Sequence, residues 1–428
     1  MPRPANTVAA AELDLAGLIR PGDRIMWGQG SAEPLALIEA LIAQRARLGG
    51  VRAFLTISFA SLLQPEHADH IAFEGLGGLG SNARLARHGL VDVYPTHFST
   101  LCREIRSGAF PIDVFMVQLA GPDAAGRYSF GTDHGYSLDA VRNARVVIAE
   151  VNAQMPFIAG EATIGADDID VIIHSDRPLM EMPLATPDAI DHAIARNVVG
   201  FVEDGATFQI GVGGVPSAIL ASLAGHRDLG VHSGMISDAV LGLIEAGVVT
   251  NARKQVDTGW SVACALFGTR DFYRRAASAP LRIVASPHIT NVATMAAIDS
   301  FIAINSAIQV DLTGQCNAEY AGGRYVGAPG GQVDFVRGAR LSRGGRSITA
   351  IRSRASGGQP RIVASLGDAP VTLARTDVDV VATEYGAAEL AGKTISQRMA
   401  ALIAIAHPDD REALERAGHS LSGRGRTA

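Results

Sequence analysis

The segment GVGGVP at residues 211–216 has the composition of a loop that could bind an anion. It follows a short apolar run that predicts a strand and precedes an Ala/Leu-rich stretch that predicts a helix. Backbone N–H groups and the helix dipole at such a junction suit a phosphate, a pyrophosphate or an oxyanion. Close packing also explains a glycine-rich loop of this kind, so the motif alone leaves both interpretations open.

This loop lacks the dinucleotide-binding fingerprint. Pro216 stands where that motif requires its third glycine, and no clear acidic residue for a ribose follows, which disfavours an NAD-dependent oxidoreductase. The sequence also lacks a G-x-S-x-G elbow and a G-x-x-x-x-G-K-[ST] loop, which argues against common serine hydrolases and P-loop nucleotidases. His67, His70 and Glu74 come nearest to a metal cluster but lack zinc-site spacing, so no metal is expected.

Two further segments have an open backbone or polar side chains. The glycine-rich segment GAPGGQVDF at residues 327–335 suits close approach of a ligand, although a tight turn between strands explains it equally well. In the stretch 304–315, strand-like alternation places polar side chains on one face, namely Asn305, Gln309 and Asp311. Because buried amides need hydrogen-bond partners, these side chains are expected either to join the core or to line a pocket.

The elements that must position these segments alternate regularly along the chain. Short β-branched runs are followed by glycine-containing turns and then by Ala/Leu-rich stretches. Examples are a strand at 24–27 before a helix at 35–48, and a helix at 137–144 before a strand at 146–151. Such alternation predicts an α/β fold with mainly parallel sheets.

An internal repeat divides the chain. Residues 17–41 and 200–223 both contain a turn glycine, a short strand, a G-x-G loop and a helix preceded by proline. Three glycine pairs share one separation of 183 residues: Gly22 and Gly205, Gly28 and Gly211, and Gly30 and Gly213. The repeat predicts two α/β halves produced by duplication, which meet near residues 185–190.

From this repeat we predict an N-terminal domain over 1–187 and a C-terminal domain over 188–412. The polar, Gly/Arg-rich segment from residue 413 to 428 is predicted to be a disordered tail.

Composition narrows the classes of function. Hydrophobic residues make up 47% of the 428 residues, the net charge is −6, and Lys and Arg are scattered, so a nucleic-acid partner is not expected. The three cysteines form no close pair, which suits a reducing compartment. Because the N-terminus carries no secretory pattern and apolar runs are too short for a membrane span, a cytoplasmic protein is expected.

Taken in order, several segments resemble the acetyl-CoA hydrolase/CoA-transferase family over nearly the whole chain. They include FQIGVGGVPSAIL, INSAIQVDLTGQCNAE and VGAPGGQVDFVRGA. The resemblance implies two CoA-transferase-like domains with the active site between them, and a homodimer or larger homo-oligomer. It implies an acyl-CoA substrate with a possible carboxylate acceptor, and no cofactor beyond coenzyme A (CoA). The family's CoA-contacting loops match Gln209, Ile210, Gly211, Val212, Gly213, Gly214, Gly330, Gly331 and Gln332.

The resemblance also implies a mechanism and a departure from it. In the family a glutamate attacks the acyl-CoA thioester, an anhydride forms, and a glutamyl-CoA thioester then passes CoA to an acceptor. That glutamate lies in a His-Thr-Glu-Met-like segment, which aligns here with HSGMISD at residues 232–238. Gly234 therefore occupies the nucleophile position and cannot form the adduct.

Three explanations remain open for this substitution. CoA thioesters could be hydrolysed or cleaved at a C–C bond with a different carboxylate as general base. A glutamate from elsewhere could reach the same place and preserve transfer. The chain could also have kept CoA binding without catalysis, as a binding subunit.

The carboxylates within or beside family-like motifs are the candidate bases: Glu319, Glu161, Glu33 and Glu384. Glu319 is preferred because it ends a polar strand-like segment, although a structural role suits each of the four. Ser233 lacks a Ser-His-Asp setting, since His232 on the same strand would point to the opposite face. Cys316 is expected to be a small core residue. The resulting hypothesis is an enzyme that releases or transfers CoA from small or medium acyl groups without the family glutamate.

Overall fold

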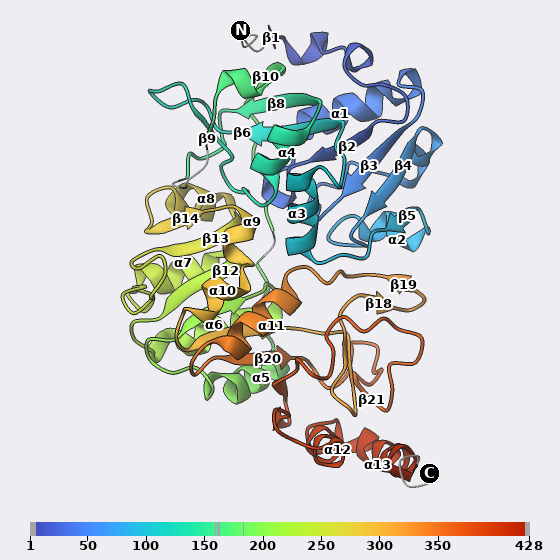
Figure 1. Cartoon of the computed structure of the whole chain (residues 1–428), viewed down its shortest axis with the longest axis vertical. Helices are drawn as coiled ribbons and strands as arrows, with labels where there is room; N and C mark the ends of the chain where they lie inside the picture. The colour runs from blue at the N-terminus through green and yellow to red at the C-terminus, as the bar shows by residue number, and fades with distance from the viewer. Residues whose placement is uncertain (1–5, 159, 161–162, 183, 424–428) are drawn as a thin grey trace.

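The computed structural model describes residues 6–158, 160, 163–182 and 184–423. This part of the chain folds into two lobes, each built around an eight-stranded sheet (Figure 1). Neighbouring strands are parallel throughout both large sheets, except for one antiparallel pair at the edge of the second. The predicted α/β class with mainly parallel sheets is confirmed.

The first sheet has the strand order β1-β10-β8-β6-β2-β3-β4-β5. Its strands are β1 (Asn6–Thr7), β2 (Arg24–Trp27), β3 (Val51–Leu55), β4 (Ile71–Gly75), β5 (Val91–Val93), β6 (Val114–Leu119), β8 (Val146–Asn152) and β10 (Val171–Ser175). The helices beside it are α1 (Leu35–Gln44), α2 (Ala83–Arg87), α3 (Phe98–Ser107) and α4 (Ser137–Asn143). The strands and helices predicted around residues 24–48 and 137–151 are confirmed.

The second sheet has the strand order β14-β13-β12-β11-β15-β20-β22-β23. Its strands are β11 (Thr207–Ile210), β12 (Gly230–Ile236), β13 (Ser261–Leu266), β14 (Leu281–Ile283), β15 (Phe301–Asn305), β20 (Arg346–Ala350), β22 (Val380–Thr383) and β23 (Gly386–Glu389). Its helices are α5 (Ala189–Val199), α6 (Gly214–Ser222), α7 (Asp238–Glu245), α8 (Arg270–Ala276), α9 (Ser286–Ile289), α10 (Val292–Ala296) and α11 (Gln332–Leu341).

The two sheets share one topology. Read from β5, the first sheet runs β5-β4-β3-β2-β6-β8-β10-β1, and its first seven strands match β14-β13-β12-β11-β15-β20-β22 in position and in chain order. The repeat read from the glycines fits this correspondence, because Gly28 directly follows β2 and Gly211 directly follows β11. The halves differ at the outer edge, where β1 is parallel to its neighbour and β23 is antiparallel. The shared order supports the predicted duplication.

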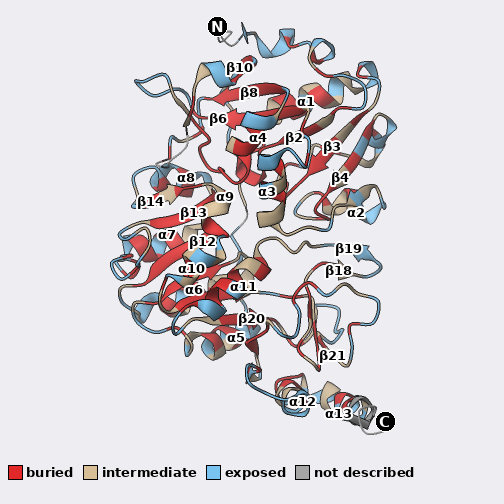
Figure 2. Cartoon of the chain, viewed as in Figure 1, coloured by how far each residue is buried: buried red, intermediate tan, exposed pale blue. Residues whose placement is uncertain are grey.

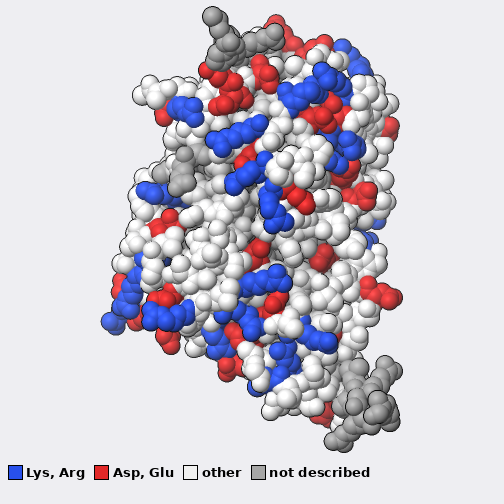
Figure 3. Space-filling view, in the orientation of Figure 1, with Lys and Arg blue, Asp and Glu red and all other residues white. Residues whose placement is uncertain are grey.

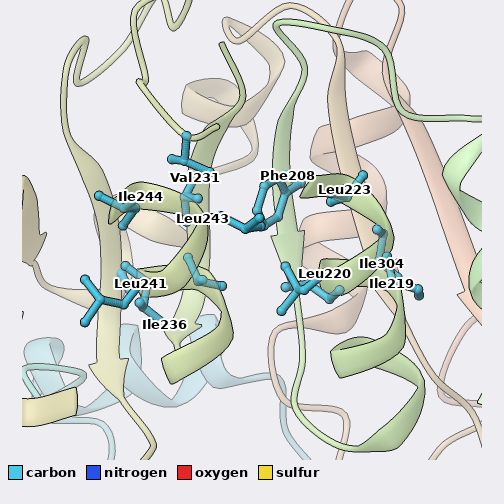
Figure 4. Close-up of a cluster of buried hydrophobic side chains, with 14 of the residues drawn as sticks. Phe208, Ile219, Leu220, Leu223, Val231, Ile236, Leu241, Leu243, Ile244 and Ile304 are labelled. Atoms are coloured by element: carbon cyan, nitrogen blue, oxygen red, sulfur yellow. The ribbon is translucent and has the colours of Figure 1, made fainter. Parts of the chain in front are cut away.

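Each sheet is buried between helical layers, so its central strands are buried on both faces (Figure 2). In the second half, alternate strand residues such as Phe208 and Val231 pack against α6 and α7, as Figure 4 shows. The opposite face carries Val262 and Phe301 against α9, α10 and α11. Burial of each such large apolar side chain contributes about 1.5–3 kcal/mol, which fixes the ends of the strands in place.

Small strands and two terminal helices complete the second half. The stretch 304–315 is divided between β15 and β16 (Gln309–Asp311), which belong to different sheets, so it is not one continuous strand. The remaining small strands are β17 (Cys316–Asn317), β18 (Tyr320–Ala321), β19 (Arg324–Tyr325) and β21 (Ile362–Val363), with β7 (Tyr128–Ser129) and β9 (Thr163–Ile164) in the first half.

The prediction of a disordered tail from residue 413 is wrong for most of its length. Helix α13 (Pro408–Gly423) follows α12 (Ile395–Ala404) and continues past residue 413. The physical reason is that Leu414 is buried in the core cluster beneath α12, while Arg354 holds Asp410 in the first turn. Residues 424–428 lie outside the described part of the chain.

Two further features concern the charge of the surface and the character of the helices. On the face shown in Figure 3, side chains of both signs are interspersed over both halves. Among the described residues, none of the helices combines the length and the apolar character needed to cross a membrane.

Candidate functional site

A cavity of about 480 Å³ lies between the two halves. The second half contributes residues that follow or end β11, β12, β13 and β15, together with the segment 327–332. The first half contributes Gln29 after β2, Ile57 after β3, Leu76 and Leu79 after β4, and Phe98 at the start of α3. The carboxyl ends of the central strands of both sheets therefore face one cavity.

The position of this cavity follows from the topology. In each sheet the chain order reverses beside a central strand, β2 in the first half and β11 in the second. In open α/β sheets ligands bind at such switch points, outside the carboxyl ends of the strands. Here the duplication brings two switch points face to face.

The end of β11 is the first predicted CoA-contacting loop. Residues 209–212 line the cavity. The Gln209 side chain exchanges two hydrogen bonds with Asn305 on the neighbouring strand, at 3.2 and 3.0 Å. Asn305 therefore both joins two strands and lines the pocket, so neither of the alternatives considered for it excludes the other. Gln309 and Asp311 do not line the pocket.

The rest of that loop lies differently. Gly213 and Gly214 are not among the lining residues. A Cβ atom at Gly214 would lie 2.4 Å from the Asp191 carboxylate, which in turn accepts hydrogen bonds from Arg352. The start of α6 therefore packs against this acid, so the glycine at 214 is explained by close packing.

The second predicted CoA-contacting loop also lines the cavity. Residues 330–332 lie at the start of α11, and the Gly330 carbonyl accepts a hydrogen bond from the Phe98 backbone N–H at 2.8 Å. The Gln332 amide donates to the Ser306 carbonyl at 3.3 Å. This segment therefore fastens the second half to helix α3 of the first. It leads into a helix rather than forming a turn between strands.

Gly234 lies in the cavity wall between these two loops. It belongs to β12, which pairs with β11, and the ring of Phe335 from α11 lies over it. A Cβ atom built at Gly234 would meet only two ring carbons of Phe335, both at the ordinary contact distance of 3.7 Å. The backbone there has room for a Cβ atom.

The candidate carboxylates lie apart from the lining. Glu319 is buried and its Oε1 accepts a hydrogen bond from Thr372 at 2.6 Å. Glu384 accepts two hydrogen bonds from Ser353. Glu161 lies outside the described residues. These contacts give Glu319 and Glu384 structural partners away from the cavity.

Glu33 is the fourth candidate, and its carboxylate is fully engaged. It accepts hydrogen bonds from the Ser58 hydroxyl and from the backbone N–H groups of Phe59 and Ala60. Burial nevertheless raises its pKa to about 7. Its donors all come from the segment after β3, so this acid organises the first half's switch point.

The neighbours of Gly234 on β12 make structural contacts. The Ser233 hydroxyl donates to the Ile210 carbonyl at 3.2 Å. The His232 ring bonds to the Ile289 carbonyl through Nε2, and burial lowers its pKa to about 3, so the ring is neutral. Cys316 is fully buried in a core cluster, as expected. Neither Ser233 nor His232 faces a partner that would activate a nucleophile.

The first-half side chains of the cavity were not predicted. Gln29 follows Gly28, so the repeat contained a signal: the equivalent of the 209–212 loop lies at 26–29. Leu76, Leu79 and Phe98 carried no such signal, because only the docking of the halves brings them to the site.

None of the described lining residues is Asp, Glu, Lys, Arg or His. In addition, no cluster of three or more metal-binding side chains occurs among the described residues.

Comparisons with known proteins agree with this geometry. The family model described as Acetyl-CoA hydrolase/transferase N-terminal domain matches residues 7–200, and the model for the C-terminal domain matches residues 268–418. The chain is 36% identical over 396 residues to the 4-hydroxybutyrate coenzyme A transferase of Clostridium kluyveri, covering 91% of this chain and 92% of that protein.

Two solved structures are similar over almost the whole chain. RipA from Yersinia pestis has a TM-score of 0.91 and 32% identity, covering 97% of this chain and 98% of that one. A 4-hydroxybutyrate CoA-transferase from Porphyromonas gingivalis has a TM-score of 0.81 and 34% identity, covering 98% of each chain. With both domain models matched and these relatives spanning its length, the chain belongs to the acetyl-CoA hydrolase/transferase family.

Proposed function

We propose that this protein binds acyl-CoA thioesters of small or medium carboxylic acids in the cavity between its halves. It releases or transfers CoA without a glutamyl-CoA intermediate at residue 234. The observation that carries this proposal is the position of Gly234: it lies in the cavity wall, between the two loops that resemble CoA-contacting segments, and has no side chain.

The lining suits the two ends of such a ligand. The second half offers backbone and amide groups along 209–212 and 330–332, which can hydrogen-bond a thioester oxygen and the pantetheine amides. The first half offers the apolar side chains of Ile57, Leu76 and Leu79, which suit an acyl chain. A cytoplasmic location and a homo-oligomeric state remain predictions.

The test is to incubate the purified protein with acetyl-, butyryl-, succinyl- and benzoyl-CoA, with and without acetate or succinate, and to follow CoA species by mass spectrometry. Free CoA formed without an acceptor is the expected result. New CoA esters that form only with an acceptor would favour transfer over hydrolysis and would indicate a carrier carboxylate elsewhere than residue 234. Failure to bind any of the esters, measured by calorimetry, would overturn the proposal as a whole.

A second candidate function is binding of CoA esters without turnover. It is favoured by one observation, namely that no charged side chain is found among the described lining residues. Tight binding of several esters with no product after long incubation would favour this function over the first.

A further inference from the structure

A buried carboxyl group lies directly behind the cavity wall. Asp133 is 1% exposed and belongs to the loop between β7 and α4 of the first half. This loop is docked on the second half: the Thr132 carbonyl accepts from the Leu266 N–H at 2.7 Å, and the His134 N–H donates to the Cys264 carbonyl at 2.9 Å. Asp133 is therefore held at the junction of the two halves, beside the end of β13.

The sheet register places Asp133 close to the empty nucleophile position. Asp133 forms an antiparallel bridge with Ala265, and Ala265 is paired with Met235 on β12. Since neighbouring strands lie about 4.8 Å apart, the Cα atoms of Asp133 and Met235 are about 10 Å apart. Both Ala265 and Met235 line the cavity, and Gly234 is next to Met235.

One oxygen of this carboxyl group is bonded to the cavity lining and the other is free. Oδ1 accepts a hydrogen bond from the Gln29 amide at 3.1 Å, and Gln29 lines the cavity. Oδ2 is buried and, within the described part of the chain, has no hydrogen-bond partner. A carboxylate retained only for packing would be expected to have both oxygens satisfied, as Glu33 has.

The surroundings of Asp133 set the pH at which this carboxyl group loses its proton. Burial raises its pKa to about 7, and the hydrogen bond from Gln29 offsets this only in part. The titratable groups that face it are Tyr136, Cys102 and Cys264, and burial raises the pKa of all three, so they stay neutral near pH 7. Burial lowers the pKa of the adjacent His134 to about 4. Asp133 is the group of this cluster that changes charge near neutral pH.

We propose that Asp133 is the general base of this cavity and activates the water that hydrolyses a bound acyl-CoA thioester. This inference rests on the proposed function and specifies its reaction. Rotation of the Gln29 side chain opens the Asp133 carboxylate to the cavity, and the free oxygen binds the reacting water.

The reaction is balanced without a further reactant. The Asp133 carboxylate takes a proton from water while the water oxygen bonds to the thioester carbonyl carbon. The tetrahedral intermediate then collapses, the C–S bond breaks, and the proton on Asp133 passes to the leaving thiolate. The products are the free carboxylic acid and the CoA thiol, and Asp133 is again a carboxylate.

The decisive variant is Asp133→Asn, which keeps the size of the side chain and an acceptor for Gln29 but cannot take a proton. Its matched control is Asp139→Asn on the same segment, because the Asp139 carboxylate is buried but bonds to Arg106 and not to the cavity lining. CoA release from acetyl-, butyryl-, succinyl- and benzoyl-CoA is followed for the wild type and both variants. Binding of the same esters is measured by calorimetry.

The expected result is a loss of at least about 100-fold in kcat for Asp133→Asn, with unchanged ester binding and with near wild-type turnover in Asp139→Asn. The wild-type rate should rise with pH through about 7 and then level, because the base must be deprotonated. The residual rate of Asp133→Asn should lack this inflection.

A single turnover in H2(18)O detects a nucleophilic Asp133 whose mixed anhydride is opened by water at the aspartyl carbon. Direct attack of water places the label in the released acid during the first turnover and leaves Asp133 unlabelled. Unlabelled first-turnover product, with label in the Asp133 carboxyl group, would overturn the general-base role.

The remaining outcomes separate this inference from the proposed function. Wild-type turnover in Asp133→Asn would overturn the inference and leave the proposed function standing. Binding of all four esters without CoA release by the wild type would also overturn it and would favour the binding function. Absence of binding would overturn the proposed function itself.

Discussion

The two switch points have the same strand order but different chemistry. In the first half, the segments after β2, β3 and β7 bring the buried carboxyl groups of Glu33 and Asp133 to the junction. In the second half, the equivalent segments bring backbone groups, side-chain amides and glycines to the same junction. Gly234 on β12 is one of these glycines. This difference places buried carboxyl groups in one copy of the duplicated scaffold and backbone and amide groups in the other.

Glycines in the G-x-G loops of the two copies also have different reasons to be glycine. A Cβ atom at Gly30 would lie 2.6 Å from the ring of Phe267, so in the first half the glycine allows the second half to dock. A Cβ atom at Gly211 would meet nothing within 4 Å, so in the second half the glycine leaves space in the cavity. The same motif therefore serves packing in one copy and an open site in the other.

The largest expected effect comes from giving the second half a carboxylate. Gly234→Glu should create CoA transfer between esters and acetate, because a Cβ atom at 234 makes only ordinary contacts, residue 234 lines the cavity, and a nucleophile would then face the thioester. Mass spectrometry of the protein after incubation with acetyl-CoA should detect a CoA adduct on residue 234. Gly234→Gln is the control of matched size and should form no adduct. An adduct-free Gly234→Glu would contradict the alignment of this position with the nucleophile.

Removing a carboxyl group from the first half should change the pH dependence of stability. The pKa of Asp133 is raised from 3.8 to about 7 on folding, so between these values the folded state binds more protons and stability falls as pH rises. This group should cost up to about 4 kcal/mol by pH 8, since one pKa unit corresponds to about 1.4 kcal/mol.

Asp133→Asn removes this cost. Its free energy of unfolding relative to the wild type should therefore increase by up to about 4 kcal/mol between pH 4 and pH 8, as urea unfolding would measure. Glu33 contributes in the same direction to both proteins and cancels in the difference. An equal effect of the substitution at both pH values would show that Asp133 does not titrate in this range.

Filling the open site should weaken binding without weakening the fold. Gly211→Leu places a side chain in the cavity, and we expect acyl-CoA to bind about 100-fold more weakly, or about 2.7 kcal/mol. Gly121→Leu is the control, because a Cβ atom there also meets nothing within 4 Å and residue 121 does not line the cavity. Unchanged affinity in Gly211→Leu would remove the 209–212 loop from the binding site.

The smallest effect concerns the packing glycine. Gly30→Ala should lower the free energy of unfolding by about 2 kcal/mol, because the new methyl group collides with Phe267 and residue 30 has a φ of 58°. Gly211→Ala should change it by no more than about 0.5 kcal/mol. Denaturant titration of both variants measures the difference; equal losses would mean that the two glycines do not differ in role.

Much of the fold was readable in the sequence. Glycines after short apolar runs located β2 and β11, and their shared spacing located the repeat. The tail was misjudged because its polar composition hides one apolar contact, that of Leu414 beneath α12. Composition reports the average of a segment, whereas a single buried side chain can decide whether it is ordered.

The sequence predicted the parts of the candidate site that glycine-rich loops form. It did not predict the parts that come together only when the two halves dock. The segments at 209–212 and 330–332 carry open glycine-rich sequences, and both line the cavity. Asp133 follows an ordinary Gly-Thr sequence and becomes distinctive only through its bridge to Ala265, which lies 132 residues away in the other half. No local pattern encodes a contact of that separation.

The room beside Gly234 also has an evolutionary consequence. A glycine codon that ends in a purine becomes a glutamate codon by one base change, and at this position a Cβ atom would make only ordinary contacts with Phe335. On the proposed alignment of Gly234 with the family nucleophile, descendants of one ancestral gene would gain or lose a covalent step by a change at a single site, while the scaffold stays intact. In such a lineage, overall similarity is a poor guide to which members carry the nucleophile, and residue 234 is the position to read first.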